Sequence, residues 1–259
     1  MRNRLLVFAT ALITQCALGQ SFEDFEVPHD TALHVGARVI TIRYVRPDRM
    51  AHETGSGFLI DEDHALTAAH VVADLPKNFP IVVQVGVLPR EWEVEGLKRQ
   101  RYLTTATVDA IDYARDLARL KLHSVVGPFK KVSVCSERPS TDTKFLLAST
   151  GEKSNGSSDP MLVGQWLPQW RHPLTDIDQF PGNAPGISAP TGMQLRVGDP
   201  VVTLGFSANE GDSGAALISE RGCIFGIVSN KTNILTPDQI TLGVTIATPI
   251  GPNEPLLQY

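Results

Sequence analysis

The chain has 259 residues, of which 42% are hydrophobic and 20% are charged, and its formal net charge is −5. This apolar content excludes an intrinsically disordered chain, and the length provides either one large domain or two domains of about 100 residues each. The acidic balance argues against nucleic acid as a partner, because binding phosphates requires a basic face.

The first residues have the organisation of a secretory signal. An apolar run follows Arg2 and Arg4, and residues 17–19, Ala-Leu-Gly, provide the small residues that signal peptidase requires. The run is shorter than the roughly 20 residues of a membrane-spanning helix, and no later segment qualifies, so no membrane span is predicted. We predict a signal peptide over residues 1–19, an N-terminal segment over residues 20–34, and a secreted or periplasmic protein.

Short β-rich runs separated by turn residues follow from residue 35 onward. The pattern contains no long periodic helix, and only residues 68–75 indicate a helical turn. The predicted strands, in chain order, are 38–45, 57–60, 81–87, 104–111, 117–122, 145–148, 201–204, 215–218, 223–228 and 242–246. Many strands at short spacing, without alternating helices, predict an all-β protein built as a sandwich or as a pair of barrels.

A polar stretch over residues 128–143 divides these strands into two sets. We predict a first unit over residues 35–127, this stretch as a linker, a second unit over residues 144–248, and a tail over residues 249–259. Within the second unit, a proline-rich segment over residues 168–200 contains few strand formers. It is predicted to be a long surface loop, and loops of this length are usually functional or mobile.

Cys135 and Cys223 are the two cysteines beyond the predicted signal peptide. In an oxidising compartment they can pair, and closing so long a loop would stabilise the fold by about 4 kcal/mol in the chain-entropy model. Two free buried thiols are the alternative, and the sequence leaves this choice open.

Two short motifs carry an imidazole and a carboxylate suited to catalysis. In T-A-A-H, residues 67–70, small alanines let His70 stand at the edge of a cleft, although a structural histidine is the alternative. Asp116 opens the alternating strand 117–122 and is drawn towards the core, where a buried carboxylate needs a partner such as the imidazole. The alternative is that this aspartate caps a turn or pairs with Arg115.

A third motif, Gly-Asp-Ser-Gly over residues 211–214, is a tight turn by composition. A serine hydroxyl becomes a nucleophile only when a neighbouring base removes its proton and a third group orients that base. Ser213 is therefore either a nucleophile or a plain turn residue. The backbone amides of Gly211 and Ser213 are suited to stabilise an oxyanion, and one such donor contributes roughly 3 to 4 kcal/mol.

Taken in order, T-A-A-H, D-L-A-R-L-K-L and G-D-S-G resemble the chymotrypsin/trypsin family of serine endopeptidases. The resemblance covers approximately residues 35–248 and implies two six-stranded antiparallel β-barrels with the active site in the cleft between them. It implies that His70 is the general base, that Asp116 orients it, and that Ser213 forms the acyl-enzyme. The implied activity is hydrolysis of peptide bonds in polypeptide substrates, with no cofactor and no metal.

The resemblance also indicates residues that contact the substrate. The strand 226–229 matches the edge that binds an extended peptide, with Ser229 beneath the catalytic aspartate. Ser207 corresponds to the floor of the primary pocket, and Gly243 to the glycine that leaves this pocket open. An uncharged floor favours uncharged side chains over Arg or Lys, although Lys231 and Glu210 at the rim can alter this preference.

The chain departs from the family pattern at several positions. Residues 215–216 are Ala-Ala where the family commonly has Gly-Pro, and no Ile-Val-Gly-Gly precedes the first barrel, so activation through a new terminal amine on Asp212 is not expected. Pro249, Pro252 and Pro255 forbid the C-terminal helix of many members. Two alternatives to an endopeptidase follow: a catalytically silent protease-fold module that binds ligands, and an esterase that uses the same triad.

Overall fold

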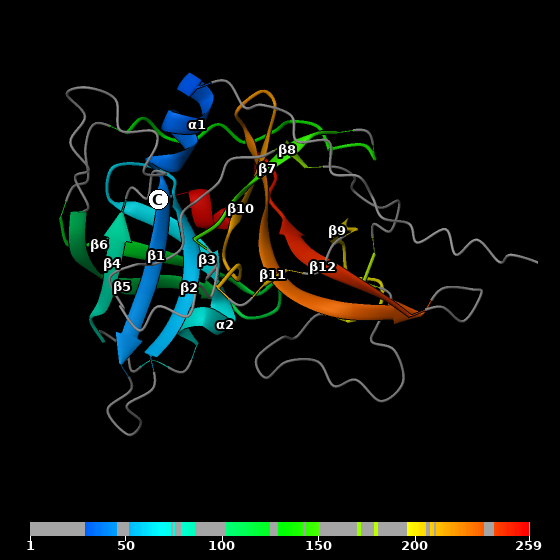
Figure 1. Cartoon of the computed structure of the whole chain (residues 1–259). Helices are drawn as coiled ribbons and strands as arrows, with labels where there is room; N and C mark the ends of the chain where they lie inside the picture. The colour runs from blue at the N-terminus through cyan, green and yellow to red at the C-terminus, as the bar shows by residue number, and fades with distance from the viewer. Residues whose placement is uncertain are drawn as a thin grey trace, which may run out of the picture.

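Figure 1 shows the computed structural model of the chain, in which two β-rich units lie side by side. The structure describes residues 29–45, 52–73, 75, 79–85, 102–124, 129–141, 143–150, 170–171, 179–180, 196–205, 208–209, 211–235 and 241–258. The predicted signal peptide, most of the proline-rich segment and Ser207 lie outside the described residues. No helix in these ranges has both the length and the apolar character of a membrane span.

The first unit is a closed barrel of six strands, all paired antiparallel. The strands are β1 (Val39–Val45), β2 (His52–Leu59), β3 (His64–Ala68), β4 (Ile81–Val85), β5 (Tyr102–Asp112) and β6 (Leu117–Leu122). Their order around the barrel is β1-β2-β3-β6-β5-β4, and β4 closes it by pairing with β1. Closure leaves this barrel without an unpaired edge strand.

Branched aliphatic side chains fill the interior of this barrel. Ile40 and Ile42 on β1, and Ile81 and Val83 on β4, are fully buried in one apolar cluster. Because successive side chains of a strand point to opposite faces, Val82 between the last two is 43% exposed. Each buried side chain of this size contributes about 1.5 to 3 kcal/mol to folding.

The second unit is a curled antiparallel sheet of six strands. The strands are β7 (Phe145–Ala148), β8 (Trp170–Arg171), β9 (Val202–Leu204), β10 (Ala216–Ser219), β11 (Ile224–Leu235) and β12 (Thr241–Pro249). Their order is β8-β7-β10-β11-β12-β9, and in the described part of the chain no ladder joins β8 to β9. The long, bent ribbons of β11 and β12 give the sheet its curl (Figure 1). The all-β architecture in two units is as predicted.

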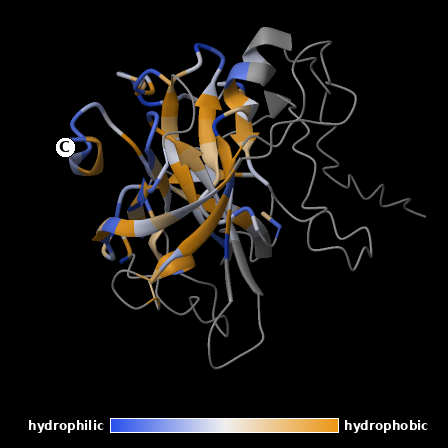
Figure 2. Cartoon of the chain, turned by 90° about the vertical axis from the view of Figure 1, so that its left-hand side faces the viewer, coloured by the Kyte–Doolittle hydropathy of each residue, from blue (hydrophilic) through white to orange (hydrophobic). Residues whose placement is uncertain are grey.

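A shared apolar core joins the two units. It combines buried side chains of the first barrel, the second sheet and the C-terminal segment: Val35, Val39, Phe58, Ile60, Leu66, Leu117, Leu146, Ala148, Ala216, Ile218, Ile224, Ile227, Ile250, Leu256 and Leu257. Figure 2 shows the hydrophobic residues gathered on the strands and hydrophilic residues on many of the connecting turns. Because both units contribute to one core, residues from the two units are held at fixed distances from one another.

The chain between the two units is bonded to both of them. Val132 N donates a hydrogen bond to Ile60 O of the first barrel at 2.7 Å. Cys135 and Cys223 form a disulfide with a Cα–Cα distance of 5.1 Å, so of the two alternatives the bonded pair is the one observed. This covalent link joins the connecting segment to the turn between β10 and β11.

The elements differ from the predicted runs at a few places. β3 and β8 were not among the predicted strands; all five residues of β3 are buried, so the strand lacks the alternation that marks a half-exposed strand. β11 continues beyond the predicted end at residue 228, after a register shift between Val228 and Asn230. The short helices are α1 (His29–Gly36), α2 (Ala69–Val72) and the 3₁₀ helix η2 (Pro255–Leu257).

Candidate active site

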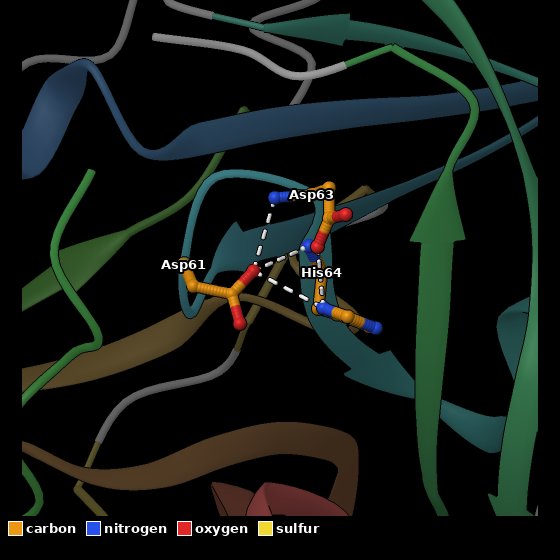
Figure 3. Close-up of side chains that lie close together, drawn as sticks. All are labelled: Asp61, Asp63 and His64. Atoms are coloured by element: carbon orange, nitrogen blue, oxygen red, sulfur yellow. Dashed lines mark hydrogen bonds and ion pairs between the residues drawn. The ribbon is translucent and has the colours of Figure 1, made fainter. Parts of the chain in front are cut away.

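The hairpin that leads to His70 is closed by an acidic turn between β2 and β3. The Asp61 carboxylate accepts hydrogen bonds from Asp63 N at 3.0 Å and from His64 N at 2.8 Å (Figure 3). The carboxylate and imidazole atoms of these three residues that could ligate a metal ion lie within 4.8 Å of one another. These atoms instead bond each other, and Lys121 Nζ on β6 bonds the Asp63 carboxylate. This bonding is that of an Asx-type turn, which fixes the start of β3.

His70 is the second residue of the four-residue helix α2, which follows β3 directly. The cap position, Ala68, supplies no side-chain hydrogen bond to the first turn. Asp116 supplies these bonds instead: its backbone oxygen accepts from Ala69 N at 3.0 Å, and its Oδ1 accepts from His70 N at 2.8 Å. The unpaired amides at the start of a helix thus find their partner on the β5–β6 loop, which fixes that loop against His70.

The Asp116 side chain also binds the imidazole. His70 Nδ1 lies 2.8 Å from Asp116 Oδ2, and the His70 side chain remains 24% exposed while the carboxylate is fully buried. Ser229 Oγ donates to the same Oδ2 atom. Three donors therefore compensate the burial of this carboxylate, which decides between the alternatives for Asp116: it binds the histidine and does not pair with Arg115.

Ser229 reaches Asp116 because of an irregularity in β11. The register of β11 against β12 shifts between Val228 and Asn230, so Ser229 has no partner in the ladder. A bulge of this kind redirects a side chain and is common beside active sites. Ser229 is fully buried, and its hydroxyl joins a strand of the second sheet to the loop of the first barrel.

Two consecutive tight turns meet at Asp212, and Ser213 lies in the second of them. Asp212 N donates to Asn209 O at 3.2 Å with Gly211 at φ 89°, and Ala215 N donates to Asp212 O at 2.9 Å with Gly214 at φ 86°. In each turn the third of the four residues has a positive φ, which favours glycine at that position. The two glycines of the motif are thus required by the backbone that presents Ser213.

The Ser213 turn packs directly on the first barrel, close to the helix that carries His70. Ser213 O accepts a hydrogen bond from Ser56 N at 2.8 Å. A Cβ atom on Gly55 would lie 2.6 Å from Val71 Cγ1 and 3.4 Å from Ser213 O, so this stretch of β2 separates the two by little more than its backbone. In the described residues, Ser213 Oγ makes no hydrogen bond to His70, and such bonds are often long before a substrate binds.

The backbone amides of Gly211 and Ser213 are unpaired within the described part of the chain. The carbonyl of Gly211, by contrast, accepts a hydrogen bond from Ser56 Oγ at 2.6 Å. The buried Asp212 carboxylate accepts from Ser149 Oγ and, at 2.8 Å, from Asn209 N. These bonds fix the turn on both sides while leaving two donors free for a ligand.

This geometry agrees with a comparison against protein families. The family model described as Trypsin matches residues 36–249. The chain belongs to the trypsin family. It is accordingly a serine-type peptidase, a hydrolase whose substrates are polypeptides.

Solved structures with the trypsin fold are similar to this chain. The Rv3671c protease of M. tuberculosis in its active form is 21% identical, with a TM-score of 0.57, covering 88% of this chain and 80% of that chain. The inactive form of Rv3671c protease is 20% identical, with a TM-score of 0.54, covering 87% of this chain and 89% of that chain. At this identity the likeness is one of fold. No curated protein matches the chain.

The residues predicted to line the substrate pocket are described only in part. Gly243 is exposed on β12, opposite Asn233 of β11. Ser207 lies outside the described residues, but the next residue, Ala208, donates its amide to Thr245 Oγ1 at 2.7 Å. The chain that leads to the Ser213 turn is therefore bonded to β12, two residues from Gly243.

Several residues of this trypsin-family site were not found from the sequence. Ser56 bonds the Ser213 turn through its amide and its hydroxyl, and Thr67 Oγ1 donates to Ser56 O at 2.7 Å. Ser149 holds Asp212. In the sequence these are ordinary hydroxyl residues in or beside strands, and their role depends on contacts between the two units.

Arg115, beside Asp116, has carboxylate partners of its own. Its guanidinium bonds both Glu254 oxygens at 2.8 Å, and its Nε bonds Asp112 Oδ2 at 2.8 Å. The hydrogen bonds that Arg115 donates to Glu254 raise the pKa of Arg115 above its ordinary value, although burial acts to lower it. Burial opposes ionisation of Asp112, but the hydrogen bonds from Arg115 hold the pKa of Asp112 below its ordinary value.

Proposed function

We propose that this trypsin-family peptidase is a secreted endopeptidase that cleaves polypeptides through an acyl-enzyme on Ser213. The observation that carries the proposal is the His70–Asp116 contact beside the Ser213 turn. With Nδ1 donating to the carboxylate, Nε2 has a free lone pair that can accept the proton of a serine hydroxyl. This is the tautomer that a general base requires.

In the first half of the reaction, Ser213 Oγ attacks the carbonyl carbon of the scissile peptide bond while His70 Nε2 accepts the hydroxyl proton. The carbonyl oxygen becomes an oxyanion. When the tetrahedral intermediate collapses, the C–N bond breaks and His70 returns the proton to the leaving amine, which gives an ester on Ser213. Asp116 stabilises the imidazolium between these two transfers.

In the second half, water attacks the ester carbonyl while His70 accepts its proton, and the acid is released as the Ser213 hydroxyl is restored. The unpaired amides of Gly211 and Ser213 support a role as the oxyanion hole. Preorganised donors of this kind stabilise charge that appears only in the transition state, at roughly 3 to 4 kcal/mol for each donor removed.

Residues 226–228 of β11 are paired on both sides, with β10 or the Ser213 turn on one side and with β12 on the other, so the predicted edge is not open over these three residues. The substrate backbone is therefore proposed to add to β11 from Ser229 onward, through main-chain hydrogen bonds. Val228 already bonds the nucleophile turn, since Gly214 N donates to Val228 O at 2.8 Å. Beyond Val228, no strand of the described residues pairs with β11 on its β10 side, and the Ser229 backbone is proposed to pair with a peptide on that side. With Ser207 as an uncharged pocket floor, uncharged side chains are proposed as the preferred cleavage sites.

Secretion is supported by the Cys135–Cys223 disulfide, since structural disulfides persist in oxidising compartments. The signal peptide over residues 1–19 is proposed from the sequence pattern. Expression of the full chain in a secreting host, followed by amino-terminal sequencing of the secreted product, checks this part of the proposal. An unprocessed amino terminus would contradict it.

A fluorophosphonate probe tests the nucleophile. We expect the probe to label the wild-type protein at Ser213 and to leave the Ser213→Ala variant unlabelled, with peptide hydrolysis reduced at least about 10⁴-fold in that variant. A folded wild-type protein that neither takes the label nor cleaves any member of a peptide library would be a silent binding module. Turnover of esters without turnover of peptides would instead identify an esterase.

A further inference from the structure

The loop that carries Asp116 has an unfavourable backbone. Asp116 has φ 56°, in the left-handed region, and it is the one non-glycine residue with positive φ in the described residues. Such a conformation costs of the order of 1–3 kcal/mol for an ordinary residue and persists only where the surroundings impose it. The loop spans residues 113–116, and Tyr113 on it is 43% exposed, so the barrel interior does not hold this side of the loop.

The C-terminal part of the chain bonds this loop from outside the barrel. Both oxygens of Glu254 accept from the Arg115 guanidinium at 2.8 Å, which is a bidentate pair. Thr248 Oγ1 on β12 donates to Arg115 O at 2.6 Å, at the peptide that leads into Asp116. Arg115 is therefore held at its side chain and at its backbone, next to the residue that binds the imidazole.

Glu254 is built into the fold as a rigid partner. Its side chain is 1% exposed, and besides Arg115 it accepts a hydrogen bond from Leu256 N at 3.2 Å, at the start of η2. The bidentate geometry fixes the guanidinium plane as well as its distance, which a single contact would not do. A buried carboxylate in this arrangement defines the position of Arg115 closely.

We propose that Glu254 is a positioning residue for the reaction: by clamping Arg115, it keeps Asp116 in the backbone conformation that holds the His70 imidazole. This inference rests on the proposed function, because it assigns Glu254 to the same triad. Glu254 fixes the Arg115 side chain, and Arg115 in turn fixes the peptide bond that joins it to Asp116. In this position Asp116 Oδ1 accepts from His70 N, and Asp116 Oδ2 bonds His70 Nδ1.

Anchoring the C-terminal segment does not by itself require this pair. Leu256 and Leu257 are buried in the core shared by the two units. Arg119 Nη1 donates to Leu256 O at 2.9 Å, and Lys131 Nζ donates to Leu257 O. The segment therefore has apolar and polar anchors that act away from Asp116, and these provide a matched control.

The test compares Glu254→Gln with Lys131→Met in the full chain. For Glu254→Gln we expect kcat to fall about 10- to 100-fold with KM nearly unchanged, because a small misplacement of a catalytic group affects the chemical step. Lys131→Met should keep both kcat and KM within twofold of the wild type.

Two results would overturn the proposal: a kcat for Glu254→Gln within twofold of the wild type, or an equal loss in both variants. Glu254→Asp, which keeps the charge but shortens the reach to Arg115, gives the same test with a smaller expected loss should Glu254→Gln fail to fold.

A readout that does not need turnover separates this proposal from the proposed function. In the Ser213→Ala background, the NMR signal of the His70 Nδ1 proton should move upfield when Glu254→Gln is added, because the hydrogen bond to Asp116 Oδ2 becomes longer. An identical Nδ1 proton signal in the two proteins would overturn the positioning role. Absence of probe labelling in the wild type, with a moved Nδ1 proton signal, would overturn the proposed function and leave the positioning role standing.

Discussion

The chemistry of the site depends on a few residues in demanding backbone conformations. Asp116 is left-handed and fully buried, and its carboxylate accepts from His70 and Ser229. Gly211 and Gly214 take positive φ values in consecutive turns, so the chain reverses twice around Ser213. Strained residues of this kind are maintained only by dense surrounding contacts, and here the contacts come from both β-rich units.

Gly214 provides a direct test at the residue scale. A Cβ atom there would lie 2.0 Å from Ser56 O and 2.3 Å from Thr67 Oγ1, in addition to the strain of φ 86°. Gly214→Ala should therefore lower the free energy of unfolding by more than about 3 kcal/mol and abolish probe labelling of Ser213. Urea denaturation measures the free energy of unfolding, and in-gel fluorescence of a fluorescent fluorophosphonate measures the labelling.

The control for this substitution is Gly222→Ala, at φ 75° with no atom within 4 Å of the added Cβ. It carries the backbone strain alone, so we expect a loss of about 1 kcal/mol with normal labelling. If both variants lose the same free energy of unfolding, the close approach of Gly214 to the first barrel does not contribute to stability.

At the scale of elements, two local features set the geometry of the site. The acidic turn at Asp61 fixes the start of β3, and β3 runs directly into the helix α2 that carries His70. On the other side, the bulge in β11 brings Ser229 to Asp116. Both features are short: the turn fixes the strand that leads to His70, and the bulge redirects the Ser229 side chain itself.

The β2–β3 turn should give the protein a measurable dependence of stability on pH. The hydrogen bond from Lys121 holds the pKa of the Asp63 carboxyl below its ordinary value of 3.8. A lowered folded-state pKa stabilises the fold above the unfolded value, and this contribution is lost as the pH falls through the folded value. Because Lys121 is 43% exposed at its side chain, we expect only about 0.5 kcal/mol.

The measurement is the difference in free energy of unfolding between the wild type and Asp63→Asn, taken from pH 7 downwards to about pH 3. The difference should be present at neutral pH and shrink below pH 3.8, the ordinary carboxyl value. Glu62→Gln is the control, since Glu62 is exposed on the same turn and has no ion-pair partner among the described residues. A difference that is constant across this range would contradict the assignment.

At the scale of the whole molecule, the site exists because two β-rich units share one core. The first barrel supplies His70 and Asp116, and the second sheet supplies Ser229 and the turn of Ser213. The C-terminal segment packs into the same core and bonds the Asp116 loop through Glu254. A loss of docking between the units would therefore separate the candidate catalytic residues His70 and Ser213.

The disulfide is expected to contribute to this docking. It closes a loop with a sequence separation of 88, which in the chain-entropy model restricts the unfolded chain strongly. The double variant Cys135→Ala with Cys223→Ala should lose about 2 to 5 kcal/mol of unfolding free energy. Denaturant unfolding with and without a reductant checks this, because reductant should destabilise the wild type to the level of the double variant and leave the variant unchanged. A wild type insensitive to a fully reducing buffer would refute the expectation.

The sequence by itself determined the fold class and the identity of the candidate catalytic residues. Strand periodicity and turn residues are local signals, and most predicted runs coincide with strands, from β1 to β12. The motifs around His70, Asp116 and Ser213 are also local, because glycine and alanine at fixed offsets reflect the backbone that each residue needs. β3 escaped prediction since a strand buried on both faces has no alternation.

The tertiary structure alone decided which groups touch. It placed the His70 imidazole, and not Arg115, against the Asp116 carboxylate. It also paired Cys135 with Cys223 and brought Glu254 to the loop that carries Asp116. These contacts join residues far apart in the chain, and their free energy arises only when the two units dock and exclude water. No local pattern predicts these contacts, because the sequence around a strand hydroxyl or carboxylate is the same whether its partner is solvent or a residue of the other unit.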